Sequence, residues 1–217
     1  MKNENDEALL EQRVVRLNGG VVEKRLKKIR EQLQALSLKS KAPITLDIRT
    51  KGGCPDASFA FNDFTQGLGV PILGLVGGGK CYSAGVIILQ GCHYRVATKN
   101  SRLLVHSVAL YEKRIRASRD YRKVYGRKFD DLDAAQDRVV ELYASASGQS
   151  KECIEELLYE GDQTETGFYC DRALAVGLLD EVLQGTWSYA GIIQSYERKL
   201  RPVEHTHPHV LPVAVNQ

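Results

Sequence analysis

Residues 79–85 read Gly-Lys-Cys-Tyr-Ser-Ala-Gly and lead into the apolar run Val86–Leu89. Because the apolar stretch Val70–Val76 precedes them, the pattern predicts a buried strand, a glycine-rich turn and then a helix. Ser83 would lie at the start of that helix, where backbone N–H groups without intrahelical partners can hold an anion. A serine that attacks a carbonyl carbon needs this environment. The stretch therefore indicates an α/β fold and a candidate nucleophile.

The same order of strand, glycine turn and helix occurs upstream. Residues 13–17 predict a short strand that ends in the turn Asn-Gly-Gly, and residues 22–38 carry apolar side chains at helical spacing. Residues 44–48 alternate apolar and polar side chains, which predicts a strand with one buried face, and a helix follows over 56–67. Repetition of this order favours a largely parallel sheet with right-handed crossovers. The units would then stack as a spiral.

The C-terminal half has a different pattern. Residues 111–130 are strongly charged and basic, and the following apolar positions predict a helix that ends before Gly148. Ser150 can cap a further helix, and a short one is expected over 171–176. We expect a flexible N-terminal arm over residues 1–12, one domain over 13–190, and a proline-broken tail over 191–217 with one helix at its start.

Composition excludes several classes of protein. The 217 residues are 43% hydrophobic and 26% charged, with a net charge of +3, as in an ordinary globular domain. This mild charge indicates no nucleic-acid partner, and no apolar run approaches the roughly 20 residues of a membrane span. The polar, acidic N-terminus does not resemble a secretory signal. The five cysteines form no C-x-x-C pair, which favours free thiols in a reducing, cytoplasmic compartment.

Acyl transfer by serine requires a hydroxyl, a base, a group that orients the base, and donors for the oxyanion. Ser83 supplies the hydroxyl, and His106 lies 23 residues later at the end of a second apolar strand. Imidazole is suited to act as the base because its ordinary pKa is near neutrality. The backbone N–H groups of Gly53 and Ala84 are the candidate oxyanion donors.

Each of these residues also has a plain structural interpretation. A serine at a helix start is usually an N-cap, a histidine after a strand is usually structural, and Gly-Gly is usually a turn. Ser83 is not in a G-x-S-x-G elbow, because position 81 is cysteine, and this argues against an α/β-hydrolase. We interpret Cys81 as a small residue that fills space near the turn. The order of the motifs, more than any one of them, supports the catalytic interpretation.

That order resembles the proteolytic subunit of the Clp protease family. The opening strand up to Gly19, the glycine loop Thr50–Gly53 and the serine turn Gly79–Gly85 each resemble a family motif. Residues Asn100–His106 read Asn-Ser-Arg-Leu-Leu-Val-His, close to the family's histidine motif, and Gly177–Val182 resembles its Gly-Leu-apolar-Asp close. The resemblance covers about residues 9 to 185 in the right order, and its histidine and Gly-Leu-Leu-Asp-Glu motifs are fairly specific.

The resemblance implies a crotonase-like ββα spiral, here with a helical extension, and a peptidase domain over residues 13–190 that carries a Ser–His–acid triad. It implies an endopeptidase that cleaves peptides or unfolded proteins without a cofactor or metal. It also implies cytoplasmic homo-oligomeric rings, stacked into a chamber and fed by a AAA+ unfoldase. No nucleic-acid or membrane partner is implied.

The chain departs from the family pattern at several positions. Counting back from Gly177 places Glu165 where the family has its triad aspartate, and Asp162 is the alternative if the loop shifts. The family's His-Gln-Pro is His-Ser-Val here, at residues 106–108. The basic segment 111–130 replaces a glycine-rich strand involved in ring stacking. Thr45 and Asp47 occupy the aromatic positions that dock the unfoldase, so the usual docking pocket is not expected.

Three functions follow from these residues. The leading hypothesis is a serine endopeptidase with Ser83 as nucleophile, His106 as base and Glu165 as orienting acid. A crotonase-type acyl-CoA enzyme could use the same paired N–H groups to polarise a thioester carbonyl, without a Ser–His pair. A non-catalytic ring subunit would keep the fold for assembly alone.

Overall fold

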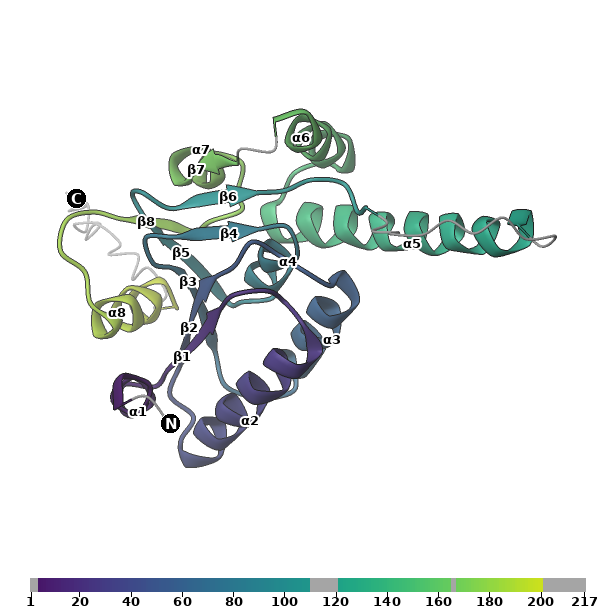
Figure 1. Cartoon of the computed structure of the whole chain (residues 1–217). Coiled ribbons are helices and arrows are strands. Elements are labelled where there is room, and N and C mark those ends of the chain that lie inside the picture. The colour runs from purple at the N-terminus through teal and green to yellow at the C-terminus, as the bar shows by residue number, and fades with distance from the viewer. Residues whose placement is uncertain (1–3, 110–120, 165–166, 201–217) are drawn as a thin grey trace, which may run out of the picture.

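The computed structural model describes residues 4–109, 121–164 and 167–200, and it contains two sheets (Figure 1). Five parallel strands form the larger sheet in the order β1, β2, β3, β5 and β8. Their bounds are Val14–Asn18, Ile44–Arg49, Ile72–Val76, Tyr94–Thr98 and Glu181–Leu183. The smaller sheet pairs β4 (Lys80–Tyr82) in parallel with β6 (Arg102–Leu104), and β6 in antiparallel with β7 (Phe168–Tyr169). The predicted parallel α/β architecture is therefore confirmed.

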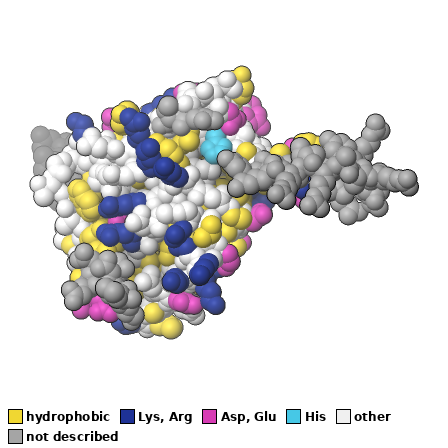
Figure 2. All heavy atoms as spheres, viewed as in Figure 1, with side chains coloured by type: hydrophobic (Ala, Val, Ile, Leu, Met, Phe, Trp, Pro, Cys, Tyr) yellow, Lys and Arg dark blue, Asp and Glu magenta, His cyan; other side chains and the backbone are white. Residues whose placement is uncertain are grey.

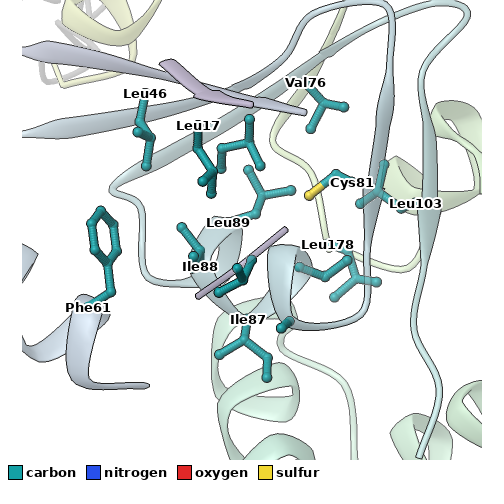
Figure 3. Packing of buried hydrophobic residues seen from close by; sticks show 14 of the residues in the cluster. Leu17, Leu46, Phe61, Val76, Cys81, Ile87, Ile88, Leu89, Leu103 and Leu178 are labelled. Carbon is teal, nitrogen blue, oxygen red and sulfur yellow. The ribbon is translucent and has the colours of Figure 1, made fainter. Parts of the chain in front are cut away.

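Helices cover both faces of the larger sheet. On one face lie α2 (Glu23–Lys39), α3 (Pro55–Gln66) and α4 (Ala84–Gln90), and on the other lies α8 (Tyr189–Leu200) (Figure 1). In Figure 3, Leu17 and Leu46 project from the sheet toward α4, with Phe61 of α3 beside them. Full burial of one such side chain contributes roughly 1.5–3 kcal/mol. This packed layer fixes the ends of the strands, where the candidate site lies.

The second face of the sheet differs from the prediction for residues 44–48. Thr45 and Asp47 point away from the main core, yet both are fully buried. Asp47 pairs with Arg16 at 3.0 Å and with Arg49 at 3.2 Å, so its charge is compensated where it is buried. The expectation of one buried face was wrong, because the second face is covered as well: cations reach the carboxylate of Asp47, while Thr45 is buried with no hydrogen-bond partner for its Oγ1 among the described residues.

Helix α8 is fastened to this second face by apolar and ionic contacts. Ile192 and Tyr196 pack against residues of β3 and β5. Asp180 accepts hydrogen bonds from Arg95, at 3.0 Å, and from Lys199 of α8, at 2.9 Å. Burial acts to raise the pKa of Asp180, but these hydrogen bonds outweigh burial and lower the pKa below its ordinary value. Asp180 therefore stabilises the docked helix as a carboxylate.

Residues 4–11 form a helix, α1 (Glu4–Glu11), and its Leu10 packs against the core. The predicted flexible arm over residues 1–12 is thus helical over most of its length. The predicted boundary at residue 190 falls inside α8, so the division into arm, domain and tail stays a prediction. Within the residues that the structure describes, no helix has the length and apolarity that a membrane span requires.

The helical extension consists of α5 (Tyr121–Ser147), α6 (Lys151–Thr164) and α7 (Cys170–Ala175). Helix α5 projects well beyond the two sheets (Figure 1), and its C-terminal part contacts α4 and α6. Ser150 caps α6 as predicted, because its Oγ accepts a hydrogen bond from Cys153 N at 3.2 Å. Of the predicted charged segment 111–130, residues up to 120 lie outside the described residues. The remainder forms the start of α5.

Candidate active site

Ser83 follows β4 directly and precedes α4. Its backbone has φ 53° and ψ −124°, a region that a residue with a side chain rarely adopts. Two backbone hydrogen bonds of 2.7 Å hold it there, from Ser83 N to Leu104 O and from Val86 N to Ser83 O. Ser83 occupies the N-cap position of α4, but its side chain makes no capping hydrogen bond, so capping does not account for a serine at this position. Strain of this kind is concentrated at functional sites.

Glycines allow the loop after β2 to approach Ser83. A Cβ on Gly52 would lie 2.7 Å from Ser83 Cβ, and Gly52 has a φ of +102°. A Cβ on Gly85 would lie 2.2 Å from Thr50 Cγ2. Thr50 also pairs with the strand before Ser83, because its N–H donates to Lys80 O at 2.7 Å. The glycine loop and the serine turn thus form one packed unit.

His106 lies two residues beyond the end of β6, slightly later than the predicted strand end, and it is half-buried. Its Nδ1 lies 2.7 Å from the carbonyl oxygen of Ser107. If Nδ1 carries the proton and donates to that oxygen, Nε2 keeps a lone pair. This is the tautomer that a general base requires.

Helix α6 packs directly against the backbone of the histidine segment. A Cβ on Gly161 would lie 1.7 Å from Val105 O and 3.4 Å from His106 Cα. The next residue, Asp162, accepts hydrogen bonds from Ser107 N at 3.0 Å and from Ser107 Oγ at 2.6 Å. Asp162 therefore holds the residue whose carbonyl oxygen contacts the imidazole of His106.

Ser83 and His106 line one cavity of about 270 Å³, together with Gly53. Among the described residues, no hydrogen bond joins the Ser83 hydroxyl to the His106 ring. Hydrogen bonds between catalytic groups are often long in unliganded enzymes, so shared access to a cavity is the informative observation. The apolar part of the cavity wall is formed by residues Pro55, Ile87, Val108, Ala109, Val139 and Tyr143.

The two predicted oxyanion donors lie in the glycine loop, at Gly53, and directly after Ser83, at Ala84. The parallel bridge between Val21 and Gly53 uses the Gly52 carbonyl and the Cys54 N–H, which leaves Gly53 N–H outside the pairing. Gly53 has no room for a side chain, because a Cβ would lie 2.1 Å from Val21 O. Ala84 is the first residue of α4, so its N–H has no intrahelical partner.

Two further residues were singled out in the sequence, Glu165 as the triad acid and Cys81 as a packing residue. Glu165 lies outside the described residues, so its predicted role stays a prediction. Cys81 is fully buried on β4, and burial raises the pKa of its thiol well above the ordinary value. This supports the interpretation of Cys81 as a packing residue. Sequence reasoning missed the apolar wall on α5, although Val139 and Tyr143 are four residues apart, as expected for one helix face.

The parallel α/β fold and the cavity shared by Ser83 and His106 are the features expected of a serine hydrolase, and the comparisons with known proteins show the family. The family model for Clp protease matches residues 2–186. The chain therefore belongs to the Clp protease family.

Three curated relatives and one solved structure are similar to the chain. ATP-dependent Clp protease proteolytic subunit 1 of Chlamydia muridarum is 27% identical over 180 residues, covering 82% of this chain and 90% of the relative. Subunit 1 of Chlamydia abortus is 29% identical, over 65% and 70% of the two chains. Subunit 2 of Pseudomonas aeruginosa is 26% identical, over 82% and 84%. The structure of a ClpP1 point mutant from Listeria monocytogenes has a TM-score of 0.71 and 21% identity, covering 87% of this chain and 99% of that one.

These comparisons confirm the resemblance to the Clp protease proteolytic subunit and the predicted fold class. They also support the predicted enzyme class, a serine peptidase of the Clp type. The roles of the individual residues rest on the geometry above.

Proposed function

We propose that this protein is a serine endopeptidase that cleaves peptides or unfolded polypeptides through an acyl-enzyme on Ser83. The observation that carries the proposal is the strained conformation of Ser83, in the wall of a cavity that it shares with His106. A structural serine needs neither the unfavourable φ nor the neighbouring imidazole. The strain therefore favours a catalytic role over a role in assembly alone.

In the proposed reaction, Ser83 Oγ attacks the scissile carbonyl carbon while His106 Nε2 accepts the hydroxyl proton. The carbonyl oxygen becomes an oxyanion that accepts hydrogen bonds from the N–H groups of Gly53 and Ala84. His106 then gives its proton to the leaving amine, and the peptide C–N bond breaks. A water molecule, deprotonated by His106, hydrolyses the ester and restores the Ser83 hydroxyl.

The orientation of His106 would depend on Asp162. Its carboxylate accepts both the N–H and the hydroxyl hydrogen bond of Ser107, whose carbonyl oxygen lies 2.7 Å from His106 Nδ1. Asp162 acts through Ser107 in this arrangement, so it is a positioning residue. The alternative, a direct contact from Glu165, concerns a residue outside the described part of the chain.

The apolar wall suggests what the site accepts. Ile87 from α4 and Val139 and Tyr143 from α5 surround the cavity beside Ser83. Since burial of apolar surface is the main source of non-polar binding energy, an apolar side chain next to the scissile bond would fit this wall.

Assembly into a cytoplasmic homo-oligomeric ring that receives substrate from a AAA+ unfoldase is part of the proposal. The relatives named above are described as proteolytic subunits of an ATP-dependent protease, which supports it. We do not expect the usual docking pocket for the unfoldase. The burial of Thr45 and Asp47 supports this expectation, because neither side chain is exposed to a partner. No nucleic-acid or membrane partner is proposed.

Hydrolysis of an internally quenched peptide with an apolar residue at the cleavage point tests the function. We expect cleavage by the wild-type protein and a loss of at least about 1,000-fold in kcat for Ser83→Ala and for His106→Ala, because the two groups act as a unit. Activity that survives Ser83→Ala would contradict the assignment. Acyl-CoA binding without cleavage would instead indicate the crotonase-type reaction, and an assembled ring that does neither would indicate a silent subunit.

A further inference from the structure

A second cavity, of about 350 Å³, adjoins the catalytic one. It lies where β1 and β2 end and β4 begins, and its wall includes Asn18–Gly20, Arg49–Lys51 and Lys80. Lys51 lines both cavities, so the two lie next to each other at the glycine loop. A peptide bound at Ser83 and extended across this loop would bring its flanking side chains to the second cavity.

This second cavity has a basic wall. Arg49 shares the carboxylate of Asp47 with Arg16, and among the described residues no carboxylate lies within ion-pair distance of Lys51 or Lys80. None of the described residues that line either cavity is Asp or Glu. Figure 2 shows Lys and Arg side chains spread over the face that carries β4 and β6, with most Asp and Glu side chains at its periphery.

Strand pairing keeps these cations close together. The parallel bridge between Thr50 and Cys81 places Lys51 and Lys80 on neighbouring segments, and the β4–β6 register places Arg102 opposite Lys80. Arg102 stacks on the ring of Tyr169 at 4.4 Å, and Lys80 lies 5.4 Å from the centre of the Tyr82 ring. Like charges held together repel, and contacts with aromatic rings compensate only part of that repulsion. A negatively charged ligand would compensate the rest.

The distance to the nucleophile is short. Lys80 is three residues before Ser83, so their Cα atoms are at most about 11 Å apart. Gly52, next to Lys51, is close enough to Ser83 for an added Cβ to lie 2.7 Å from Ser83 Cβ. An extended peptide advances about 3.3 Å per residue, so a side chain two to four residues from the scissile bond reaches the basic wall.

We propose that this cavity is a subsite for acidic side chains of the peptide substrate, with Lys51 and Lys80 as the residues that determine specificity. The substrate being a peptide rests on the proposed function. The cations act by attracting a carboxylate of the bound chain and take no part in the chemistry at Ser83.

The test uses internally quenched octapeptides with a fixed leucine at the cleavage point, in which Glu or Gln is placed at each flanking position in turn. Glu and Gln have nearly the same shape, so the ratio of their kcat/KM values reports charge alone. We expect a preference for Glu of about two- to fivefold per lysine at one or two adjacent positions, decreasing as salt is added. Lys51→Glu and Lys80→Glu should abolish or reverse this preference.

Lys39→Glu is the matched control, because it makes the same change of charge at the far end of α2, about 24 Å along the helix from its start. This variant should keep the preference for Glu. Equal cleavage of the Glu and Gln peptides by the wild type, or an unchanged preference in Lys80→Glu, would overturn the proposal.

Binding of the same peptides to Ser83→Ala, followed by fluorescence anisotropy, separates this proposal from the peptidase function. Tighter binding of the Glu peptide, without cleavage by the wild type, would support the subsite and contradict the function. Cleavage by the wild type with equal binding of both peptides would support the peptidase function and contradict the acidic subsite. Competition by inorganic phosphate with no difference between Glu and Gln would identify a general anion site and overturn the peptide subsite.

Discussion

Gly161→Ala would press α6 against the backbone that carries His106. The added Cβ would lie 1.7 Å from Val105 O and 2.8 Å from Val105 C, and neither atom belongs to a side chain that can rotate away. Since an ordinary carbon–oxygen contact is about 3.3 Å, the two segments would have to separate by about 1.6 Å. Overpacking of this kind costs about 1–3 kcal/mol. For a chain of this length, 2 kcal/mol corresponds to a loss of about 4–8 °C in Tm.

The displacement would also reach the site, because His106 Cα lies 3.4 Å from the same added Cβ. A misplacement of about 1 Å can cost about 100-fold in rate, so we expect kcat for peptide cleavage to fall by about that factor. Thermal unfolding and steady-state kinetics measure the two effects on one preparation. The KM should change less than kcat, because the apolar wall on α4 and α5 is not displaced.

Gly126→Ala is the control for this substitution. Gly126 also lies within a helix, α5, but in the described part of the chain an added Cβ would meet no heavy atom within 4 Å other than the backbone of its own helix. Alanine there should stabilise the helix by up to about 1 kcal/mol and leave kcat unchanged. If Gly161→Ala kept both the wild-type Tm and the wild-type kcat, the packing of α6 against the histidine segment would be refuted.

Three further predictions concern single side chains. Asp162→Ala should lower kcat by about 10- to 100-fold through loss of its charge-assisted hydrogen bonds, with partial recovery in Asp162→Asn; a wild-type kcat in Asp162→Ala would exclude the positioning role. Iodoacetamide at pH 8 should label exposed Cys54 in the folded protein and leave buried Cys81, with its raised pKa, unmodified; mass spectrometry showing modified Cys81 would contradict this. Because the pKa of Asp180 is lowered in the folded state, its stabilising effect is present above about pH 4 and is lost as pH falls through the folded-state pKa. The Tm of the wild type should therefore fall more between pH 6 and pH 3 than that of Asp180→Asn, and equal falls would argue against this role.

Much of the fold could be predicted because its signals are local. The apolar spacing in α2 and the alternation in β2 gave bounds within one or two residues of those observed. The burial of Thr45 and Asp47 could not be predicted, because it depends on Arg16 and on the helix that covers the second face of the sheet. Such burial is a property of tertiary contacts, and strand periodicity does not report it.

The candidate site was predictable in part for the same reason. Ser83 and His106 each follow a glycine-rich or apolar segment, and parallel strands bring these segments to one edge of the molecule. The contact between Ser107 and Asp162 spans 55 residues and joins a loop to a helix, so no local pattern contains it. The basic cavity likewise depends on the register that aligns three strands.

The most direct test of the central claim is labelling of the purified protein with a fluorophosphonate probe, followed by mass spectrometry of the digested product. Only an activated serine beside a base reacts rapidly with such a probe. The structure predicts a single adduct on Ser83, which is absent in Ser83→Ala and strongly reduced in His106→Ala. An unlabelled Ser83 in a folded, assembled sample, or labelling that does not depend on His106, would contradict the assignment of this cavity as a serine peptidase active site.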